Sequence, residues 1–198
     1  MKDLKKIIKT TIREFLNENQ TITDDIVQKV NTFFEEEGYS NYLIPKPFWD
    51  NMIAGGSEGT VYKTINNDIV IKITDSYANF RNAKILYNEE PKFSVKTIDY
   101  FDGFGETTMG YKIYVIVMEK LDVIFDNKLN NKLKELYCRL VYKKNYDDIL
   151  FDKSELKYKF QTIIGYNELL NIGITNFDCK GNNLMYDEKN DRIKIIDV

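Results

Sequence analysis

The chain has 198 residues, of which 43% are hydrophobic, so it is long enough to bury a core as one domain. Its 28 basic and 31 acidic side chains give a net charge of −3, which offers no reason to expect a nucleic acid or an anionic membrane as partner. The absence of histidine excludes Ser-His-Asp and Cys-His catalysis and histidine-liganded metal sites. Two cysteines and no run of about 18 apolar residues favour a cytoplasmic protein without a disulfide framework or a membrane span.

Residues 2–18 repeat apolar side chains at the spacing of an amphipathic helix. The apolar stripe differs from the continuous apolar core of a secretory signal. We therefore expect residues 1–21 to form a separate N-terminal helix, which docks on the rest of the chain or in the groove of a partner. Its end, Leu16-Asn17-Glu18, also resembles the capsid-targeting peptides of proteins packaged in tailed-phage heads, and that resemblance implies a virion-packaged protein.

A second amphipathic helix is predicted to follow, with a start at Thr23 or Asp24 and an end at Gly38. Its apolar face consists of Ile26, Val27, Val30, Phe33 and Phe34. Together with the proline-containing segment after it, this helix makes residues 22–49 a helical extension and linker.

From residue 50 onward, short stretches rich in β-branched residues and bounded by turn residues predict strands. The predicted strands are residues 51–54, 60–65, 69–74, 94–101 and 112–119, and a short helix is predicted at residues 76–87. The second half changes to helical periodicity, over residues 127–143 and 154–171, before a hairpin of residues 183–186 and 192–196. Strands followed by helices predict an α+β fold with two lobes around a cleft: an antiparallel-sheet lobe over residues 50–121 and a reduced helical lobe over residues 122–198.

A glycine-rich turn lies between the first two predicted strands and contains Ala54, Gly55, Gly56, Gly59 and Val61. Glycines between two strands let backbone N–H groups approach phosphates, although a plain glycine-containing hairpin is the alternative. A dinucleotide-binding turn is disfavoured because a strand follows the glycines where a helix is required. Lys72, one hairpin downstream, is either a solvated strand lysine or a cation that reaches the phosphates under the glycines.

A carboxylate, a lysine and an amide are gathered on one short loop, at Asp178, Lys180 and Asn183. A second carboxylate, Asp197, returns at the end of the following hairpin. Phosphoryl transfer needs such a set: an acid that orients a hydroxyl, a cation for the transferred phosphate, and oxygen ligands for magnesium. A polar turn followed by an ordinary hairpin is the alternative interpretation of the same residues.

The glycine-rich turn and Lys72 resemble the first motifs of the protein-kinase superfamily. Gly56, Gly59 and Val61 match the pattern G-x-G-x-x-G-x-V, in which Ala54 replaces the first glycine, and Val70-Ile71-Lys72 resembles the V-A-I-K strand. The resemblance implies that this loop, with Gly55, covers the phosphates of ATP and that Lys72 holds the α- and β-phosphates.

The later motifs of the same superfamily follow in order, so that the resemblance extends from residue 50 to the end of the sequence. Val117 to Leu121 resembles the hinge, Asp178 with Asn183 resembles the catalytic loop D-x-x-x-x-N, and Asp197 falls where the D-F-G aspartate belongs. The resemblance implies that Asp178 is the catalytic base and that Lys180 contacts the γ-phosphate. It further implies that Glu119 and Leu121 contact the nucleotide through their backbones and that Met185 also contacts it. Asn183 and Asp197 are implied as ligands of Mg²⁺.

The chain also departs from the family pattern. Asn176 and Phe177 replace the His-Arg pair that precedes the catalytic aspartate, which argues against a switch by activation-loop phosphorylation. Asn82 stands where a glutamate that pairs with the lysine is expected, and an amide cannot neutralise the charge of a lysine. Glu89 and Glu90 are nearby but are expected past the end of that helix.

Two functions follow from these matches and departures. An ATP- and Mg²⁺-dependent phosphotransferase, acting on a hydroxyl of a protein or a small molecule, accounts for Lys72, Asp178, Asn183 and Asp197. A pseudokinase, which is a nucleotide-binding or interaction module without catalysis, accounts for Asn82 and for a sequence that ends one residue after the expected metal ligand. That ending is read either as a fragment or as a minimal kinase-like protein.

Overall fold

The computed structural model describes residues 22–56, 59–107, 109–124, 126–175, 177, 179 and 183–196. They form two compact units. The first contains the described residues as far as Phe80, together with Tyr100–Val117, and the second contains Arg81–Asp99 together with the described residues from Met118 onward. The helix predicted within residues 1–21, together with its resemblance to a capsid-targeting peptide, lies outside the described residues. Of the helices that are described, none is long and apolar enough to cross a membrane.

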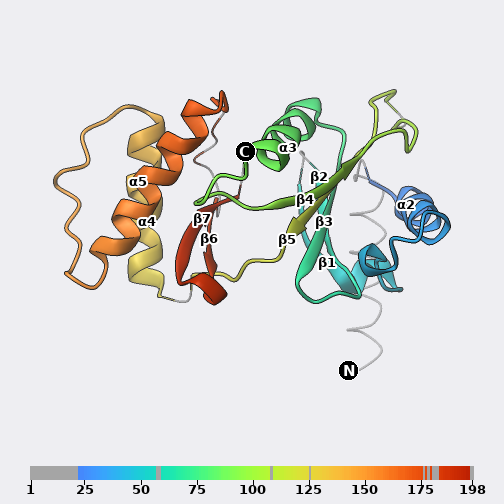
Figure 1. Ribbon diagram of the computed structural model, residues 1–198, viewed down its shortest axis with the longest axis horizontal. Helices are drawn as coiled ribbons and strands as arrows, with labels where there is room; N and C mark the ends of the chain where they lie inside the picture. Colours follow the sequence, from blue (N-terminus) through green and yellow to red (C-terminus); the bar gives the residue numbers. More distant parts are fainter. Residues whose placement is uncertain are drawn as a thin grey trace, which may run out of the picture. The chain divides into compact units, whose positions relative to one another are not determined.

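Five strands form one antiparallel sheet in the order β1-β2-β3-β5-β4 (Figure 1). They are β1 (Met52–Gly56), β2 (Gly59–Lys63), β3 (Ile69–Thr74), β4 (Thr97–Phe101) and β5 (Tyr114–Glu119). On β3 the side chains of Ile71 and Ile73 point to one face and are fully buried, whereas Lys72 between them is half-buried. The sheet confirms the α+β class that the alternating apolar residues predict.

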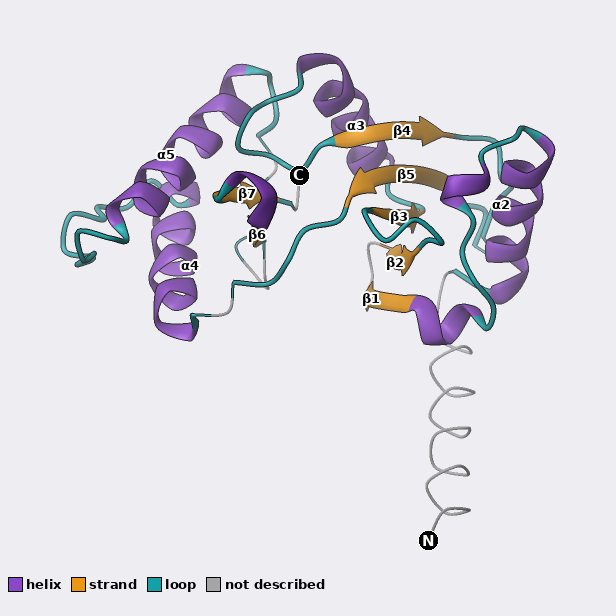
Figure 2. Cartoon of the chain, turned by 60° about the horizontal axis from the view of Figure 1, so that its bottom comes forward, coloured by secondary structure: helices purple, strands orange, loops and turns teal. Residues whose placement is uncertain are grey.

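Helix α2 (Asp24–Glu36) begins and ends where the sequence predicts. Gly38 just beyond it has a φ of +80°, the left-handed conformation that commonly closes a helix. The apolar face of α2 brings Phe33 and Phe34 onto Phe101 at the end of β4, with ring centroids 5.3 and 5.6 Å apart. Figure 2 shows α2 beside that end of β4. Aromatic packing therefore makes the helical extension part of the first unit.

The strand predicted at residues 94–101 is divided in the structure. Strand β4 begins only at Thr97, whereas Ser94 pairs in parallel with Ile195 in the second unit. The N–H of Val95 donates to the carbonyl of Ile195 at 2.9 Å, which continues this pairing. A run of alternating apolar residues predicts an extended segment but does not identify its partner, so the division could not be predicted from the pattern.

The second unit consists of two helices and a hairpin. They are α4 (Asn127–Val141), α5 (Leu156–Asn171), β6 (Leu184–Asp187) and β7 (Arg192–Ile195), all close to the predicted bounds. Asp126 caps α4, because its carboxylate accepts the N–H groups of Lys128 and Leu129 at 2.8 and 3.1 Å. The core beneath these elements contains Leu133, Leu136, Leu169, Ile174, Leu184 and Ile193, each at most 2% exposed.

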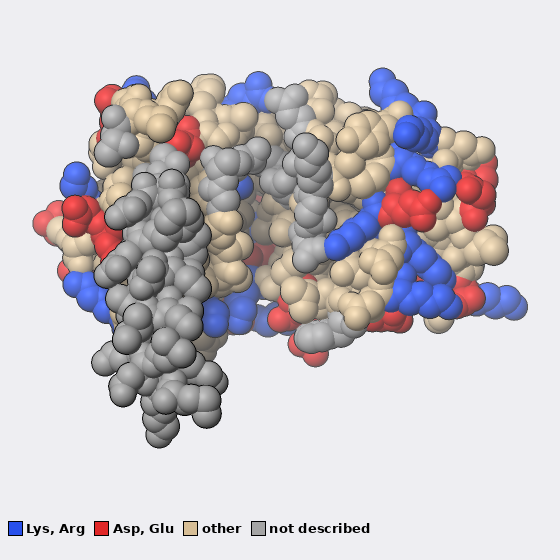
Figure 3. Space-filling view, turned by 180° about the vertical axis from the view of Figure 1, so that it is seen from behind, with Lys and Arg blue, Asp and Glu red and all other residues tan. Residues whose placement is uncertain are grey.

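Charged side chains of the second unit form ion pairs with one another. Lys132 approaches Glu155 to 2.5 Å, and Arg139 bonds both Glu135 and Asp148. Figure 3 shows basic and acidic side chains interspersed on the face that it draws.

Gly165, in the middle of α5, marks a close approach between this helix and the segment that precedes β4. A Cβ at this position would lie 2.8 Å from the Cβ of Phe93, 3.0 Å from its carbonyl oxygen and 3.5 Å from Cδ1 of Ile195. The same Phe93 carbonyl accepts the N–H of Ile195 at 3.0 Å. The backbone at Phe93 therefore cannot move away from α5 without disturbing its pairing with β7.

The variant Gly165→Ala is expected to lower the free energy of unfolding by about 1–3 kcal/mol, because overpacking outweighs the helix propensity that alanine gains. Asn167→Ala, at an exposed position of the same helix, is the control and should be neutral or slightly stabilising. Urea unfolding followed by circular dichroism measures both variants. A Gly165→Ala protein as stable as wild type would contradict the close packing of α5 on Phe93.

Candidate functional site

The glycine-rich residues lie on the hairpin of β1 and β2. Its register pairs Ala54 with Val61, Gly55 with Thr60, and Gly56 with Gly59. The residues between Gly56 and Gly59 lie outside the described part of the chain. The two strands thus run antiparallel up to the glycines. A hairpin whose backbone closes over a phosphate group has to have this arrangement.

Lys72 lies on the strand next to this hairpin, directly opposite Val61 in the pairing of β2 with β3. Thr60 is paired with Ile73 in the same register. The sequence predicts Lys72 one hairpin downstream of the glycines, and the register brings it within one strand of them. In the first unit, therefore, a half-buried lysine and a glycine hairpin are neighbours on one sheet.

Gly59 is required for a reason that is independent of any ligand. Its φ is +124°, and a Cβ there would lie 2.4 Å from the carbonyl oxygen of Ile73 and 2.9 Å from the Cβ of Thr74. Both the backbone conformation and the space therefore exclude a side chain. The match of Gly59 to a glycine-loop pattern is accordingly weaker support for phosphate binding than the match of its neighbours.

The variant Gly59→Ala should lower the free energy of unfolding by clearly more than the roughly 1 kcal/mol expected for strain at a positive φ alone. Gly103→Ala is the matched control, since Gly103 has a φ of +90° and a Cβ added there would meet nothing within 4 Å. Chemical unfolding gives both free energies. Equal losses for the two variants would show that the contact with β3 contributes nothing.

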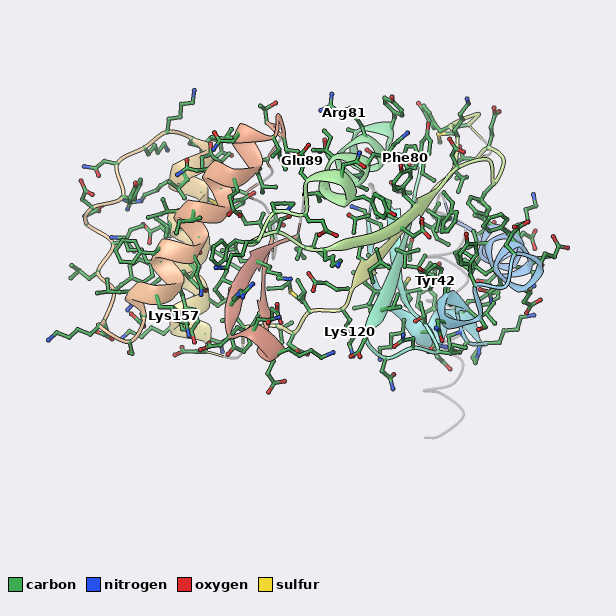
Figure 4. The ribbon with its side chains drawn as sticks, in the orientation of Figure 1. Tyr42, Phe80, Arg81, Glu89, Lys120 and Lys157 are labelled. Atoms are coloured by element: carbon green, nitrogen blue, oxygen red, sulfur yellow. The ribbon has the colours of Figure 1, made fainter. Side chains whose placement is uncertain are left out.

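Helix α3 (Tyr77–Glu89) carries the residues from which a partner for the lysine was expected. It buries two amides, those of Asn79 and Asn82, and its one acidic residue is exposed. That residue is Glu89, which is the last residue of the helix, so the expectation that it lies past the helix end is wrong (Figure 4). Glu90 follows the helix with a φ of +44° and pairs with Lys96 at 3.6 Å. At Asn82, where the sequence resemblance expects a carboxylate, α3 thus buries an amide.

The predicted hinge leaves the sheet at the end of β5. The N–H of Glu119 donates to the carbonyl of Lys96 at 3.1 Å, and its Oε1 accepts the N–H of Lys96 at 2.6 Å. Leu121 is half-buried and packs against the core of the second unit. Asp122 then pairs with Tyr186 of β6 through two backbone hydrogen bonds of 2.8 and 2.9 Å. The hinge backbone is therefore fixed at both ends within the second unit.

The two sequence neighbours of Asp178, Phe177 and Cys179, contact helices of the second unit, while Asp178, Lys180 and Asp197 themselves lie outside the described residues. The ring of Phe177 lies 4.9 Å from that of Tyr166 on α5 and 6.4 Å from that of Tyr137 on α4, between centroids. The carbonyl of Cys179 accepts a hydrogen bond from Sγ of Cys138 at 3.2 Å. Phe177 replaces the arginine of the family pattern with an apolar anchor.

Asn183 and Met185 lie at the start of the β6–β7 hairpin. Asn183 is 7% exposed, and its carbonyl accepts the N–H of Ile196 at 3.0 Å. Asn183 is thus paired with the residue that precedes Asp197 in the sequence. Met185 is half-buried and lies opposite Lys194 in the hairpin register.

Of the two predicted magnesium ligands, the structure describes Asn183, at this end of the hairpin. Asn183 supplies an amide oxygen and Asp197 a carboxylate, and both are hard oxygen ligands of the kind Mg²⁺ prefers. Within the described ranges, no group of three or more His, Cys, Asp or Glu side chains is placed to hold a metal ion.

The turn of the β6–β7 hairpin is tied to α5 through Asp191. Its carboxylate accepts hydrogen bonds from Lys157, from the hydroxyl of Tyr158 at 2.9 Å and from that of Tyr186 at 2.9 Å. The bond from Lys157, labelled in Figure 4, is the main cause that lowers the pKa of Asp191. The bond to Asp191 in turn raises the pKa of Tyr186 to about 12. This network holds the hairpin at the end opposite to Asn183.

Comparisons with known proteins support the fold and leave the chemistry open. No family model and no curated protein sequence matches the chain. A solved structure of a MAP kinase from Leishmania major matches over 87% of this chain, with a TM-score of 0.50 and 16% sequence identity. The match covers 50% of that kinase, so this chain spans about half its length. The comparison confirms the protein-kinase-like fold, with an antiparallel sheet in one part and helices in the other.

Proposed function

We propose that the chain is a phosphotransferase that uses ATP and magnesium to transfer the γ-phosphate to a hydroxyl of a protein or a small molecule. The observation that carries this proposal is the register of the first unit, in which Lys72 lies one strand from the glycine hairpin within a kinase-like fold. A lysine and a glycine turn this close together can hold the phosphates of one nucleotide.

The proposed nucleotide contacts follow from the sequence motifs of each unit. In the first, the backbones of Ala54, Gly55, Gly56 and Gly59 with Val61 would cover the phosphates, and the ammonium of Lys72 would hold the α- and β-phosphates. In the second, the backbones of Glu119 and Leu121 and the side chain of Met185 would contact the nucleotide. The fixed course of the hinge backbone supports this assignment, because adenine is recognised by backbone groups in defined positions.

The chemical roles fall to the loop and the hairpin of the second unit. Asp178 would orient the acceptor hydroxyl and take its proton, and Lys180 would contact the γ-phosphate. Asn183 and Asp197 would hold Mg²⁺, which when bound neutralises charge on the phosphate oxygens. The contacts of Phe177 and Cys179, the sequence neighbours of Asp178, support these roles.

A pseudokinase is the second candidate function, and one observation favours it. Helix α3 buries the amide of Asn82 where the family pattern has a carboxylate that orients the lysine. A nucleotide-binding module without transfer would tolerate this replacement better than an enzyme, since transfer requires that the phosphates be held in one geometry. Binding of ATP is common to an enzyme and to a nucleotide-binding pseudokinase, and transfer separates the two.

Millimolar Mg-ATP is expected to raise the melting temperature of the protein, because a ligand that binds only the folded state adds about 2.7 kcal/mol at a hundredfold excess over Kd. Lys72→Ala should reduce the shift. Thermal unfolding with Mg-ATP, with ATP in EDTA and with magnesium alone measures it. A folded wild-type protein without a shift in Mg-ATP would contradict both the enzyme and the nucleotide-binding module.

The variant Asp178→Asn should lower phosphate transfer about 100-fold or more while nucleotide affinity stays nearly unchanged, because the lost charge acts on the acceptor hydroxyl. Asp197→Asn should weaken Mg-ATP binding as well, since it removes a metal ligand. Asp147→Asn, at an exposed position, is the control. Labelled ATP, with generic protein, small hydroxyl compounds and the chain itself as acceptors, gives the transfer rates. Wild type that binds Mg-ATP and transfers nothing would favour the pseudokinase.

A further inference from the structure

Lys194 is a buried cation to which the sequence analysis assigns no role. Of the lysines that the structure describes, it alone is buried, with 7% of its surface exposed. Its Nζ lies 2.5 Å from Oε1 of Glu119 and 3.2 Å from Oδ2 of Asp187. An ammonium group withdrawn from water is strongly destabilising unless carboxylates compensate it, so this arrangement has to be held in place by its partners.

The carboxylates of Asp187 and Glu119 each accept further hydrogen bonds, from different parts of the second unit. Asp187 accepts two hydrogen bonds from Asn190, at 3.2 Å from the backbone N–H and at 2.9 Å from the side-chain amide, and so closes the hairpin turn. Burial alone would raise the pKa of Asp187, but the bond from Asn190 and the charge of Lys194 outweigh it and lower the pKa. Glu119 instead accepts the N–H of Lys96 and belongs to the predicted hinge. Lys194 therefore joins the hairpin to the hinge.

The hinge has two attachments to the hairpin. Lys194 on β7 holds the side chain of Glu119, and Tyr186 on β6 holds the backbone of Asp122. The backbone of Lys120 and Leu121 spans the distance between these attachments. Two fixed points three residues apart leave this stretch little freedom, which lowers the entropy lost when a ligand orders it.

We propose that Lys194 is a positioning residue for adenine recognition, which fixes the backbone of residues 119–121 by holding the carboxylate of Glu119. The inference rests on the proposed function, because it presumes that this backbone contacts the base. Lys194 acts through Glu119 and not on the nucleotide. Its loss would affect contacts with the base, whereas the proposed phosphate contacts are those of the glycine hairpin and Lys72.

Binding of two ligands separates positioning from plain stabilisation of the fold. Mg-ATP carries both base and phosphates, and magnesium tripolyphosphate carries only the phosphates. Lys194→Met should lower the affinity for Mg-ATP about five- to tenfold, equivalent to one weakened hydrogen bond or slightly more, and change the affinity for tripolyphosphate by less than about twofold. A residue that merely stabilises the fold would leave the ratio of the two affinities unchanged. Isothermal titration calorimetry of the full chain measures both.

Three further variants complete the experiment. Lys194→Arg keeps the cation and should restore most of the affinity for ATP, and Lys153→Met, at an exposed position of the same unit, should leave both affinities unchanged. The double variant Glu119→Gln with Lys194→Met removes both charges, which avoids an unpaired Glu119 carboxylate if the single variant does not fold. It should show the same selective loss of ATP affinity as Lys194→Met.

The outcomes separate the inference from the proposed function. If wild type binds Mg-ATP and the folded variants bind ATP and tripolyphosphate in the wild-type ratio, the positioning role is overturned and the proposed function stands. If folded wild type binds no Mg-ATP, the proposed function is overturned and the inference with it. A selective loss of ATP affinity that Lys194→Arg reverses supports both.

Discussion

The second unit depends on strand β7, because both edges of this strand are hydrogen-bonded. One edge pairs with β6, and the other pairs with the segment at Ser94 and Val95. Helix α5 packs closely on Phe93 and on Ile195 of this strand at Gly165. The buried Lys194 of the same strand forms an ion pair with Glu119 of the predicted hinge. Four residues, Arg192–Ile195, thus connect the helices, the hairpin and the hinge. A site assembled on these parts is positioned by the same hydrogen bonds that stabilise the fold.

One residue of the predicted catalytic loop, Phe177, is fixed by its contacts with the helices of the second unit. The residue before Asp178 is Phe177, whose ring packs on two tyrosines of the helices, and an apolar ring offers nothing to a phosphate group. The position of Phe177 is therefore determined by packing on α4 and α5.

Much of the fold could be predicted from the sequence, because the periodicity of apolar residues reports directly on burial. Helix α2, strand β3 and the β6–β7 hairpin have nearly the predicted bounds. The pairing partner of the strand predicted at residues 94–101 could not be predicted. Alternating apolar and polar residues are compatible with pairing in the five-stranded sheet and with pairing to β7 alike. Lys194 was missed for a related reason. An alternating strand predicts a solvent-facing lysine, and Glu119, which covers it, is 75 residues away in the sequence. The predicted roles of Asp178, Lys180 and Asp197 remain predictions.

The most direct test of the proposed nucleotide site is a crystal structure of the protein with magnesium and a non-hydrolysable ATP analogue. We expect the base to contact the backbones of Glu119 and Leu121, the phosphates to lie beneath the glycine hairpin near Lys72, and oxygen atoms of Asn183 and Asp197 to ligate the metal. A nucleotide bound away from these residues, or a metal ion held without Asn183 and Asp197, would contradict the assignment of a kinase-type site to this fold.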